Sequence, residues 1–175
     1  ASGNVRFFLD LVGSSIQRVE MDDPSRPLVV SARRQTEAAR GVGKRQLDQL
    51  DRLGPRGGDL KRLALGVGKV FFELTRRPQG RAPEPTSFVL AGAPEAIADA
   101  KALLVEGISH LAFEAGPRTK ATSDHELRDD EYRLHPVFSP FFEMSFRRKR
   151  RITLDAEALA HLRAHPRQAI KALLR

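Results

Sequence analysis

The sequence of 175 residues contains no cysteine, and no hydrophobic run approaches the ~18 residues that a membrane-spanning helix needs. The absence of cysteine excludes disulfides, thiolate zinc sites and cysteine nucleophiles. No signal-peptide pattern opens the chain, so we expect a cytoplasmic protein with no membrane partner. A chain of this length can bury roughly 70% of its unfolded surface as one domain or two small ones. Its 41% hydrophobic and 30% charged residues exclude a wholly disordered polypeptide.

Positive charge exceeds negative charge and is unevenly distributed along the chain. The formal net charge of +8 favours a polyanionic partner such as nucleic acid. Residues 31–83 carry 13 basic and five acidic residues, residues 84–146 carry five and 11, and residues 147–175 carry nine and two. This pattern predicts two basic faces around an acidic module.

Hydrophobic spacing predicts helices through the first part of the chain. The predicted helices cover residues 5–17, 31–40, 44–53 and 60–76. Gly41 and Gly43 are expected to break the basic helix into two, and Asp59 is expected to cap the longest one. Turn-forming residues at 22–27 and three prolines within residues 78–85 predict linkers.

Beyond residue 85 the hydrophobic period changes. The predicted elements are a strand at residues 87–90, a helix at 94–105, a strand at 108–113, a polar hairpin at 115–130 and a strand at 132–134. This order is typical of the second half of a winged-helix domain. Two short helices should follow, one capped by Asp155 and one beginning near His165 and Pro166.

Two GVGK strings, at residues 41–44 and 66–69, invite comparison with a phosphate-binding loop. That loop needs a glycine five residues before the Gly-Lys pair and a Ser or Thr after it. Ala38 and Leu63 stand at the glycine positions, and neither lysine is followed by Ser or Thr. We therefore interpret both strings as sites of close helix packing.

The five histidines do not predict a metal site or a catalytic centre. His161 and His165 are four residues apart, but they share a helix face only if the helix continues up to Pro166. Arg128 and His135 are similar to an arginine–histidine ribonuclease pair, but the stretch is predicted to be a strand, where the two would not converge. No catalytic residue and no metal ligand are assigned.

The run RRKRR at residues 147–151 is attached to apolar sequence on both sides, which distinguishes it from a loose tail. Adjacent cations repel one another unless they are solvated or face phosphates. A solvated strand or helix edge is the alternative to a nucleic-acid face. The candidate nucleic-acid-binding residues are Arg33, Arg34, Arg40, Lys44, Arg45, Arg147, Arg148, Lys149, Arg150 and Arg151.

Four phenylalanines, Phe138, Phe141, Phe142 and Phe146, precede this run. Stacking of such rings on single-stranded bases is one use for them. Burial is the other, and it is favoured because nearby prolines pin an irregular segment against a domain. We expect all four rings to belong to the core.

Two stretches resemble AAA-plus ATPases of the origin-recognition type. SGNVRFFLDL, residues 2–11, resembles their third lid helix, and YRLHPVFSPFFEMSFRRKRRITL, residues 132–154, is similar to a late segment of bacterial members. The resemblance implies the carboxy-terminal portion of a larger ATPase, in which Arg6 matches the arginine that senses the terminal phosphate of the nucleotide. No complete Walker loop and no acidic magnesium-binding motif are present. We therefore expect this chain not to be an enzyme and to hold no cofactor, with ATP and magnesium bound in the parent protein.

Taken with this resemblance, the expected fold is mainly α with a small β-hairpin. A lid-helix remnant would cover residues 1–21 and a basic helical region residues 28–77. A winged-helix-like α+β domain with carboxy-terminal helices would cover residues 86–175.

The favoured functional hypothesis is a nonenzymatic segment that binds the phosphate backbone of nucleic acid, in particular duplex DNA. The predicted recognition helix offers only Lys101 as a cation beside Glu95 and Asp99, which argues against base readout. The alternative is a protein–protein interaction module whose acidic winged-helix face docks a partner protein or another copy. A third possibility, an unrecognised enzyme, has no convergent nucleophile, base and oxyanion donors to support it.

Overall fold

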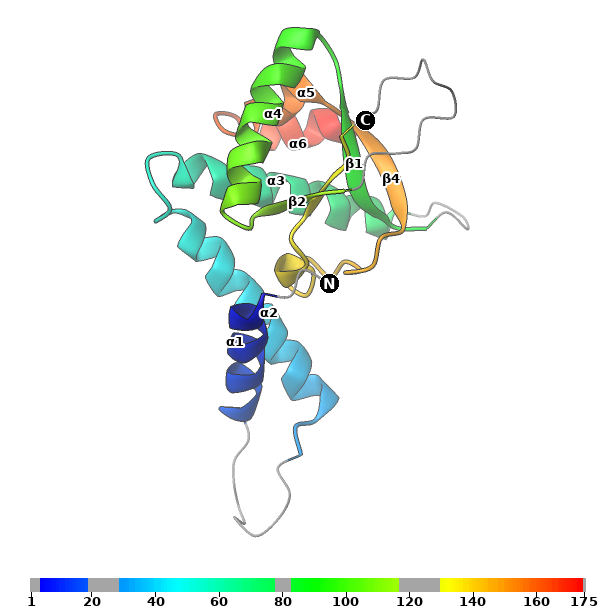
Figure 1. Cartoon of the computed structure of the whole chain (residues 1–175). Helices are drawn as coiled ribbons and strands as arrows, with labels where there is room; N and C mark the ends of the chain where they lie inside the picture. The colour runs from blue at the N-terminus through cyan, green and yellow to red at the C-terminus, as the bar shows by residue number, and fades with distance from the viewer. Residues whose placement is uncertain (1–3, 19–28, 78–82, 117–129, 175) are drawn as a thin grey trace.

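The computed structural model describes residues 4–18, 29–77, 83–116 and 130–174. Its helices are α1 (Val5–Ile16), α2 (Ala32–Leu50), α3 (Gly57–Arg76), α4 (Pro94–Ser109), α5 (Ala156–His161) and α6 (Pro166–Leu173), with one 3-10 turn, η1 (Pro136–Phe138). Its strands are β1 (Pro85–Ala91), β2 (Phe113–Ala115), β3 (Tyr132–Leu134) and β4 (Arg150–Asp155). In Figure 1, α1 and the first part of α2 run side by side in a narrow extension below a wider part that holds the sheet and the other helices. No described helix combines the length and apolar composition needed to span a membrane.

The helix α2 is unbroken, so the break predicted at Gly41 and Gly43 is wrong. It begins after Ser31, whose hydroxyl accepts a hydrogen bond from the backbone N–H of Arg34 at 3.4 Å. Glycine in a helix interior costs about 1 kcal/mol relative to alanine. Packing favours it here, because a Cβ added at Gly43 would lie 2.9 Å from the carbonyl oxygen of Val137.

The helix α3 carries the predicted apolar stripe into the core. It begins at Gly57 without a side-chain cap, so the prediction that Asp59 caps it is wrong. Asp59 instead lies in the first turn, where a carboxylate interacts favourably with the helix dipole. Leu63, Val67 and Phe71 are fully buried along this helix.

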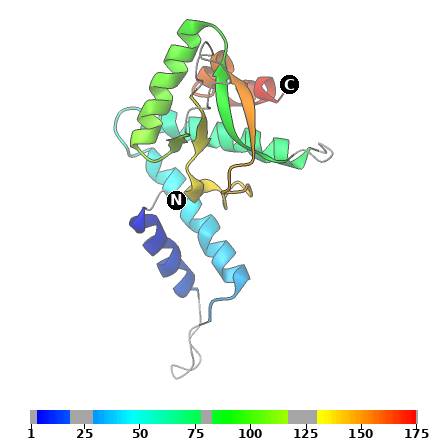
Figure 2. The same cartoon turned by 45° about the vertical axis from the view of Figure 1, so that its right-hand side comes forward.

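The four strands form a mixed sheet in the order β2-β3-β1-β4. β3 pairs antiparallel with both β2 and β1, whereas β4 pairs parallel with β1. Figure 2 shows β1 and β4 adjacent along their length. The strands predicted at residues 87–90 and 132–134 are confirmed. The strand predicted at residues 108–113 is wrong, because α4 continues to Ser109 and β2 starts at Phe113.

The fold class is mainly helical with a small mixed sheet, and the winged-helix assignment is not confirmed. The hairpin of β2 and β3 borders β1 on one side, and β4 borders it on the other side and runs parallel to it. Most of the predicted wing, residues 117–129, lies outside the described residues.

One core cluster extends from α2 to α6. Phe71 of α3 contacts Phe88 of β1 with ring centroids 6.2 Å apart, and Phe88 contacts Tyr132 of β3 at 5.8 Å. The predicted cap at Asp155 is confirmed, since its carboxylate accepts a hydrogen bond from the Ala158 N–H at 2.7 Å. The predicted three-part division of the chain stays a prediction.

Candidate nucleic-acid interface

The arginine segment, residues 147–151, leads from an irregular loop into β4. Its backbone is held at two points. The Lys149 N–H donates to Thr86 Oγ1 at 2.8 Å, and the Arg150 N–H donates to the carbonyl oxygen of Glu84 at 3.3 Å. The segment is therefore attached to folded structure, as its sequence context predicts, and it enters an edge strand of the sheet.

The side chains of the arginine segment fall into two groups. The Lys149 ammonium lies 2.6 Å from the Glu84 carboxylate, and Arg150 Nε donates to the Pro83 carbonyl oxygen at 3.0 Å. Arg147 and Arg148 are exposed, and neither forms an ion pair with any residue of the described ranges. These two guanidinium groups are therefore the ones best placed for an external phosphate, while Arg151 is exposed on β4.

The five basic residues of α2 that were predicted to bind nucleic acid also fall into two groups. Three form ion pairs: Arg33 with Glu37 at 3.0 Å, Arg40 with Glu143 at 2.9 Å, and Arg45 with Asp10 at 2.7 Å. Exposed pairs of this kind contribute at most about 1 kcal/mol each to stability. The last two nevertheless join α2 to the loop before the arginine segment and to α1. Arg34 is half-buried and Lys44 is exposed, and the described part of the chain supplies neither with an ion pair.

Arg6 lies exposed in the first turn of α1. Its backbone N–H donates to Asn4 Oδ1 at 3.1 Å, which caps the helix. The residue lines a hollow of about 200 Å³ together with Gln46, Gln49 and His110. The side chain is therefore accessible, as a nucleotide-sensing arginine must be, and the sensing role itself stays a prediction.

Both GVGK strings lie inside helices, one in α2 and one in α3. A Cβ added at Gly66 would lie 2.6 Å from a methyl carbon of Leu162, and a Cβ added at Gly68 would overlap the ring of Phe142. Lys69 forms an ion pair with Glu73 at 2.6 Å. The interpretation of the strings as packing sites is confirmed.

A polar cluster on the hairpin of β2 and β3 was not predicted. Glu114 and Arg133 are register partners, and Arg133 Nε donates to Glu114 Oε2 at 2.6 Å. His135 is 3% exposed, its Nδ1 accepts from the Val137 N–H at 3.2 Å, and its Nε2 lies 3.7 Å from Glu114 Oε1. Burial lowers the pKa of His135, the Glu114 carboxylate opposes that change, and Arg133 adds to it. Predicting this cluster from the sequence would have required the register between β2 and β3.

The histidines gather no metal-ligand set in the ranges that the structure describes, where no group of three His, Cys, Asp or Glu side chains could hold an ion. His161 ends α5 and His165 precedes α6, so the two do not share one helix. Arg128, the other half of the ribonuclease-like pair with His135, lies outside the described residues.

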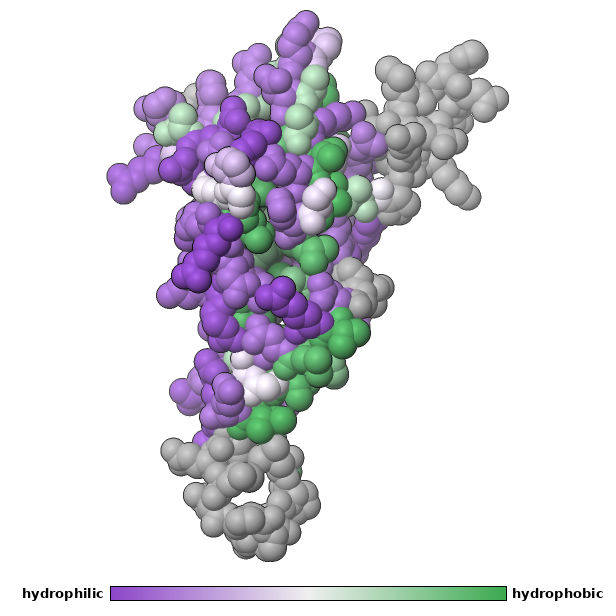
Figure 3. All heavy atoms as spheres, turned by 60° about the vertical axis from the view of Figure 1, so that its left-hand side comes forward, coloured by the Kyte–Doolittle hydropathy of each residue, from purple (hydrophilic) through white to green (hydrophobic). Residues whose placement is uncertain are grey.

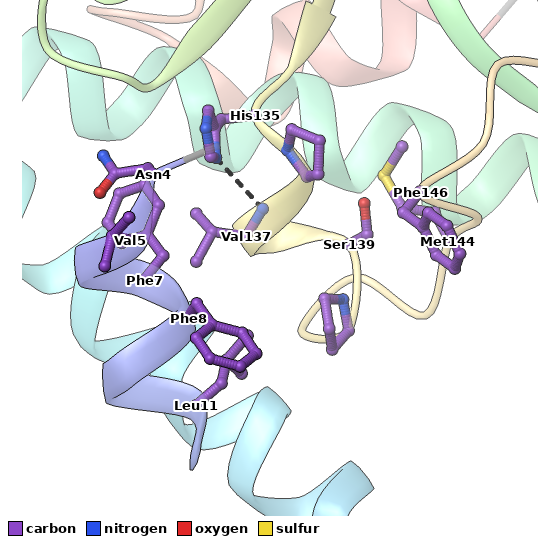
Figure 4. Close-up of a pocket in the computed structure, with 12 residues that line it drawn as sticks. Asn4, Val5, Phe7, Phe8, Leu11, His135, Val137, Ser139, Met144 and Phe146 are labelled. Carbon is purple, nitrogen blue, oxygen red and sulfur yellow. Dashed lines mark hydrogen bonds between the residues drawn. The ribbon is translucent and has the colours of Figure 1, made fainter. Parts of the chain in front are cut away.

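The expectation that all four phenylalanines belong to the core is wrong for Phe146. Phe138 and Phe142 are buried and Phe141 is partly buried, whereas Phe146 is 65% exposed. Figure 4 shows its ring beside Met144, across a hollow of about 600 Å³ from Phe8 of α1.

The helix α1 exposes an apolar face of its own. Five of its residues keep between 38% and 66% of their surface exposed: Val5, Phe8, Leu9, Val12 and Ile16. Figure 3 shows hydrophobic residues gathered along the narrow lower part of the molecule on one side. An exposed apolar stripe of this kind is typical of a protein–protein contact.

A family model described as ORC-CDC6-like matches residues 1–154 of the chain. The chain belongs to the ORC-CDC6-like family. No curated protein and no solved structure matches it. The predicted resemblance to ATPases of the origin-recognition type is confirmed at the level of the family.

The matched part of this ORC-CDC6-like chain contains all of the predicted nucleotide-sensing and nucleic-acid-binding residues. It includes α1 with Arg6, the basic helix α2 and the arginine segment. The helices α5 and α6 lie beyond it and close the core through Leu159 and Ala169. Membership makes this chain a relative of origin-recognition ATPases.

Proposed function

We propose that this ORC-CDC6-like chain is a nonenzymatic, nucleic-acid-binding part of an origin-recognition-like AAA-plus ATPase. It contacts the phosphate backbone of duplex DNA. The observation that supports this most directly is the pair Arg147 and Arg148, two exposed residues directly before Lys149, whose backbone N–H is bonded to Thr86 of β1. Guanidinium groups bind phosphate oxygens through paired hydrogen bonds, and a fixed backbone loses less entropy on binding.

Other cations would extend the contact. The remaining candidates are Arg34 and Lys44 on α2 and Arg151, which is exposed on β4. ATP and magnesium would bind to another part of the ATPase, where Arg6 would sense the terminal phosphate. We expect the protein to act in the cytoplasm.

A salt series tests the phosphate contacts. We expect binding of a duplex to weaken steeply with salt, because each phosphate contact releases counterions. The double variant R147A/R148A should reduce the slope of log K against log salt concentration by about 0.9 for each lost contact, or up to roughly 1.8. Fluorescence anisotropy of a labelled duplex across salt concentrations measures both quantities.

The matched control for this series is R62A/R167A, which removes two exposed arginines from α3 and α6. It lowers the net charge by the same amount and should change the slope little. Equal slopes for the wild type and R147A/R148A would contradict the proposal.

A second candidate function is a protein–protein interaction module. The exposed apolar face of α1 favours it, since five large hydrophobic residues on one short helix exceed the scattered exposure of an ordinary surface. The partner would be another copy of the chain or another protein.

A further inference from the structure

Phe146 differs from other exposed apolar residues in its neighbours. Phe8, which is 63% exposed, belongs to the apolar face of α1, whereas Phe146, at 65%, is followed directly by Arg147 and Arg148. An aromatic ring beside two exposed cations is unsuited to a purely apolar contact, because burying the ring would also remove the charges from water.

The backbone that carries Phe146 is held in place. Arg133 Nη1 donates to the Phe146 carbonyl oxygen at 3.5 Å, and Arg133 is itself fixed by Glu114 at 2.6 Å. The next residue, Arg147, donates its N–H to Ser145 Oγ at 3.1 Å. The ring is therefore presented on an anchored segment, which lowers the entropy cost of using it for binding.

The two arginines lie close to the ring and to the hairpin. The Arg147 guanidinium carbon is 5.8 Å from the centroid of the Phe146 ring. A Cβ added at Gly116, at the end of β2, would lie 2.9 Å from Arg148 Nη2, so this guanidinium lies against the hairpin backbone. One aromatic face and two cations thus occur within three consecutive residues.

We propose that Phe146, Arg147 and Arg148 form a binding site for an unpaired nucleotide of single-stranded nucleic acid. The ring stacks on the base, and the arginines bind the flanking phosphates. Single-strand-binding surfaces combine these two features, and stacking tolerates any base because every base has a π-face. The inference rests on the proposed function and goes beyond it, because bases within a duplex are already stacked and do not offer this face.

The absence of tryptophan from the chain makes the site directly observable. In F146W the new indole is the sole tryptophan, and we expect its fluorescence to be quenched by an oligothymidylate. An abasic oligonucleotide of the same length, which has phosphates without bases, should quench it little. V105W places an exposed tryptophan on α4, where the residue is 58% exposed, and should not respond to either ligand.

Alanine and leucine variants measure the affinity. F146A should weaken oligothymidylate binding by roughly 5- to 150-fold while leaving binding of a blunt duplex hairpin nearly unchanged. F146L retains apolar bulk but has no aromatic ring, so it should resemble F146A. Circular dichroism checks that each variant is folded, which is expected because the ring is mostly exposed.

The outcomes separate this inference from the proposed function. If F146A and F146L bind oligothymidylate as the wild type does while R147A/R148A weakens duplex binding, the stacking site is wrong and the phosphate contact stands. If the wild type binds neither ligand, both fail. Equal quenching of F146W by the abasic oligonucleotide contradicts stacking. An emission shift of F146W that depends on protein concentration alone would show instead that a second copy buries the ring.

Discussion

The imidazole of His135 lies against Phe7 of α1, with ring centroids 5.0 Å apart. Its Nδ1 accepts a backbone hydrogen bond, so the neutral ring carries its proton on Nε2. Nε2 makes no hydrogen bond with the described residues. Burial removes the ring from water and disfavours its charged form, which lowers the pKa of His135 from its ordinary value of 6.5. The Glu114 carboxylate opposes this change and Arg133 adds to it.

This lowered pKa predicts how stability depends on pH. As the pH falls below about 6.5, the unfolded chain takes up a proton at this residue before the folded protein does. The free energy of unfolding should then decrease by at most about 1.4 kcal/mol per pH unit, until the pH passes the folded pKa. Urea denaturation between about pH 8 and about pH 5 measures this slope.

H135N is the comparison for that measurement. Its amide oxygen can accept the Val137 N–H, but it does not titrate, so its stability should depend less on pH over the same interval. Parallel curves for the two proteins would assign the dependence to other groups.

Individual basic residues were identifiable from sequence, but their partners were not. Arg40 pairs with a glutamate 103 residues away and Arg45 with an aspartate 35 residues away. A charge count reports where cations occur and carries no information on which carboxylate the fold brings to each. For this reason, only some of the basic residues predicted on α2 are available to bind an external phosphate.

At the scale of elements, local sequence patterns were sufficient to predict the helices, strands and caps that are determined by their own residues. The helix α1, the strand β1 and the cap of α5 follow hydrophobic spacing and capping chemistry, and they were predicted. The strand β4 was missed because only Ile152 and Leu154 are hydrophobic in it, so its own residues give a weak strand pattern and it depends on pairing with β1. The sequence wrongly predicts a break in α2 because glycine has a low helix propensity. In the structure, close packing of Gly43 against η1 outweighs that propensity.

The glycines of α3 give an element-scale prediction. G68A should lower the free energy of unfolding by about 1–3 kcal/mol, because the new methyl group overlaps the buried Phe142 ring. G13A in α1 is the matched control, since nothing lies within 4 Å of a Cβ added there. It should stabilise the protein by up to about 1 kcal/mol. Chemical denaturation measures both values, and a G68A protein as stable as G13A would contradict the packing role.

At the scale of the whole molecule, the narrow extension of α1 and α2 carries an apolar face that the other described residues leave exposed (Figure 1). Phe7 and Leu11 of α1 pack toward the core, while Leu9 is 61% exposed. A helix with apolar residues on both sides is suited to lie between two packing partners.

Self-association through this face is the expected outcome for the isolated chain. Sedimentation velocity should show larger species as concentration rises, and L9E should abolish them because it places a charge in the contact. V105E introduces the same charge at a residue of α4 that is 58% exposed, and it should leave association unchanged. A wild type that stays monomeric at every concentration would contradict self-association through α1.

The amino-acid sequence by itself determined the helices with regular hydrophobic spacing, the excess of positive charge and the family, since these depend on residue order alone. Tertiary structure decided that β4 completes a mixed sheet and that Arg40 and Arg45 form ion pairs within the protein. It also decided that Phe146 is exposed beside Arg147 and Arg148. Those outcomes depend on contacts between residues far apart in the chain. Their free energy comes from packing and register, which no local pattern encodes.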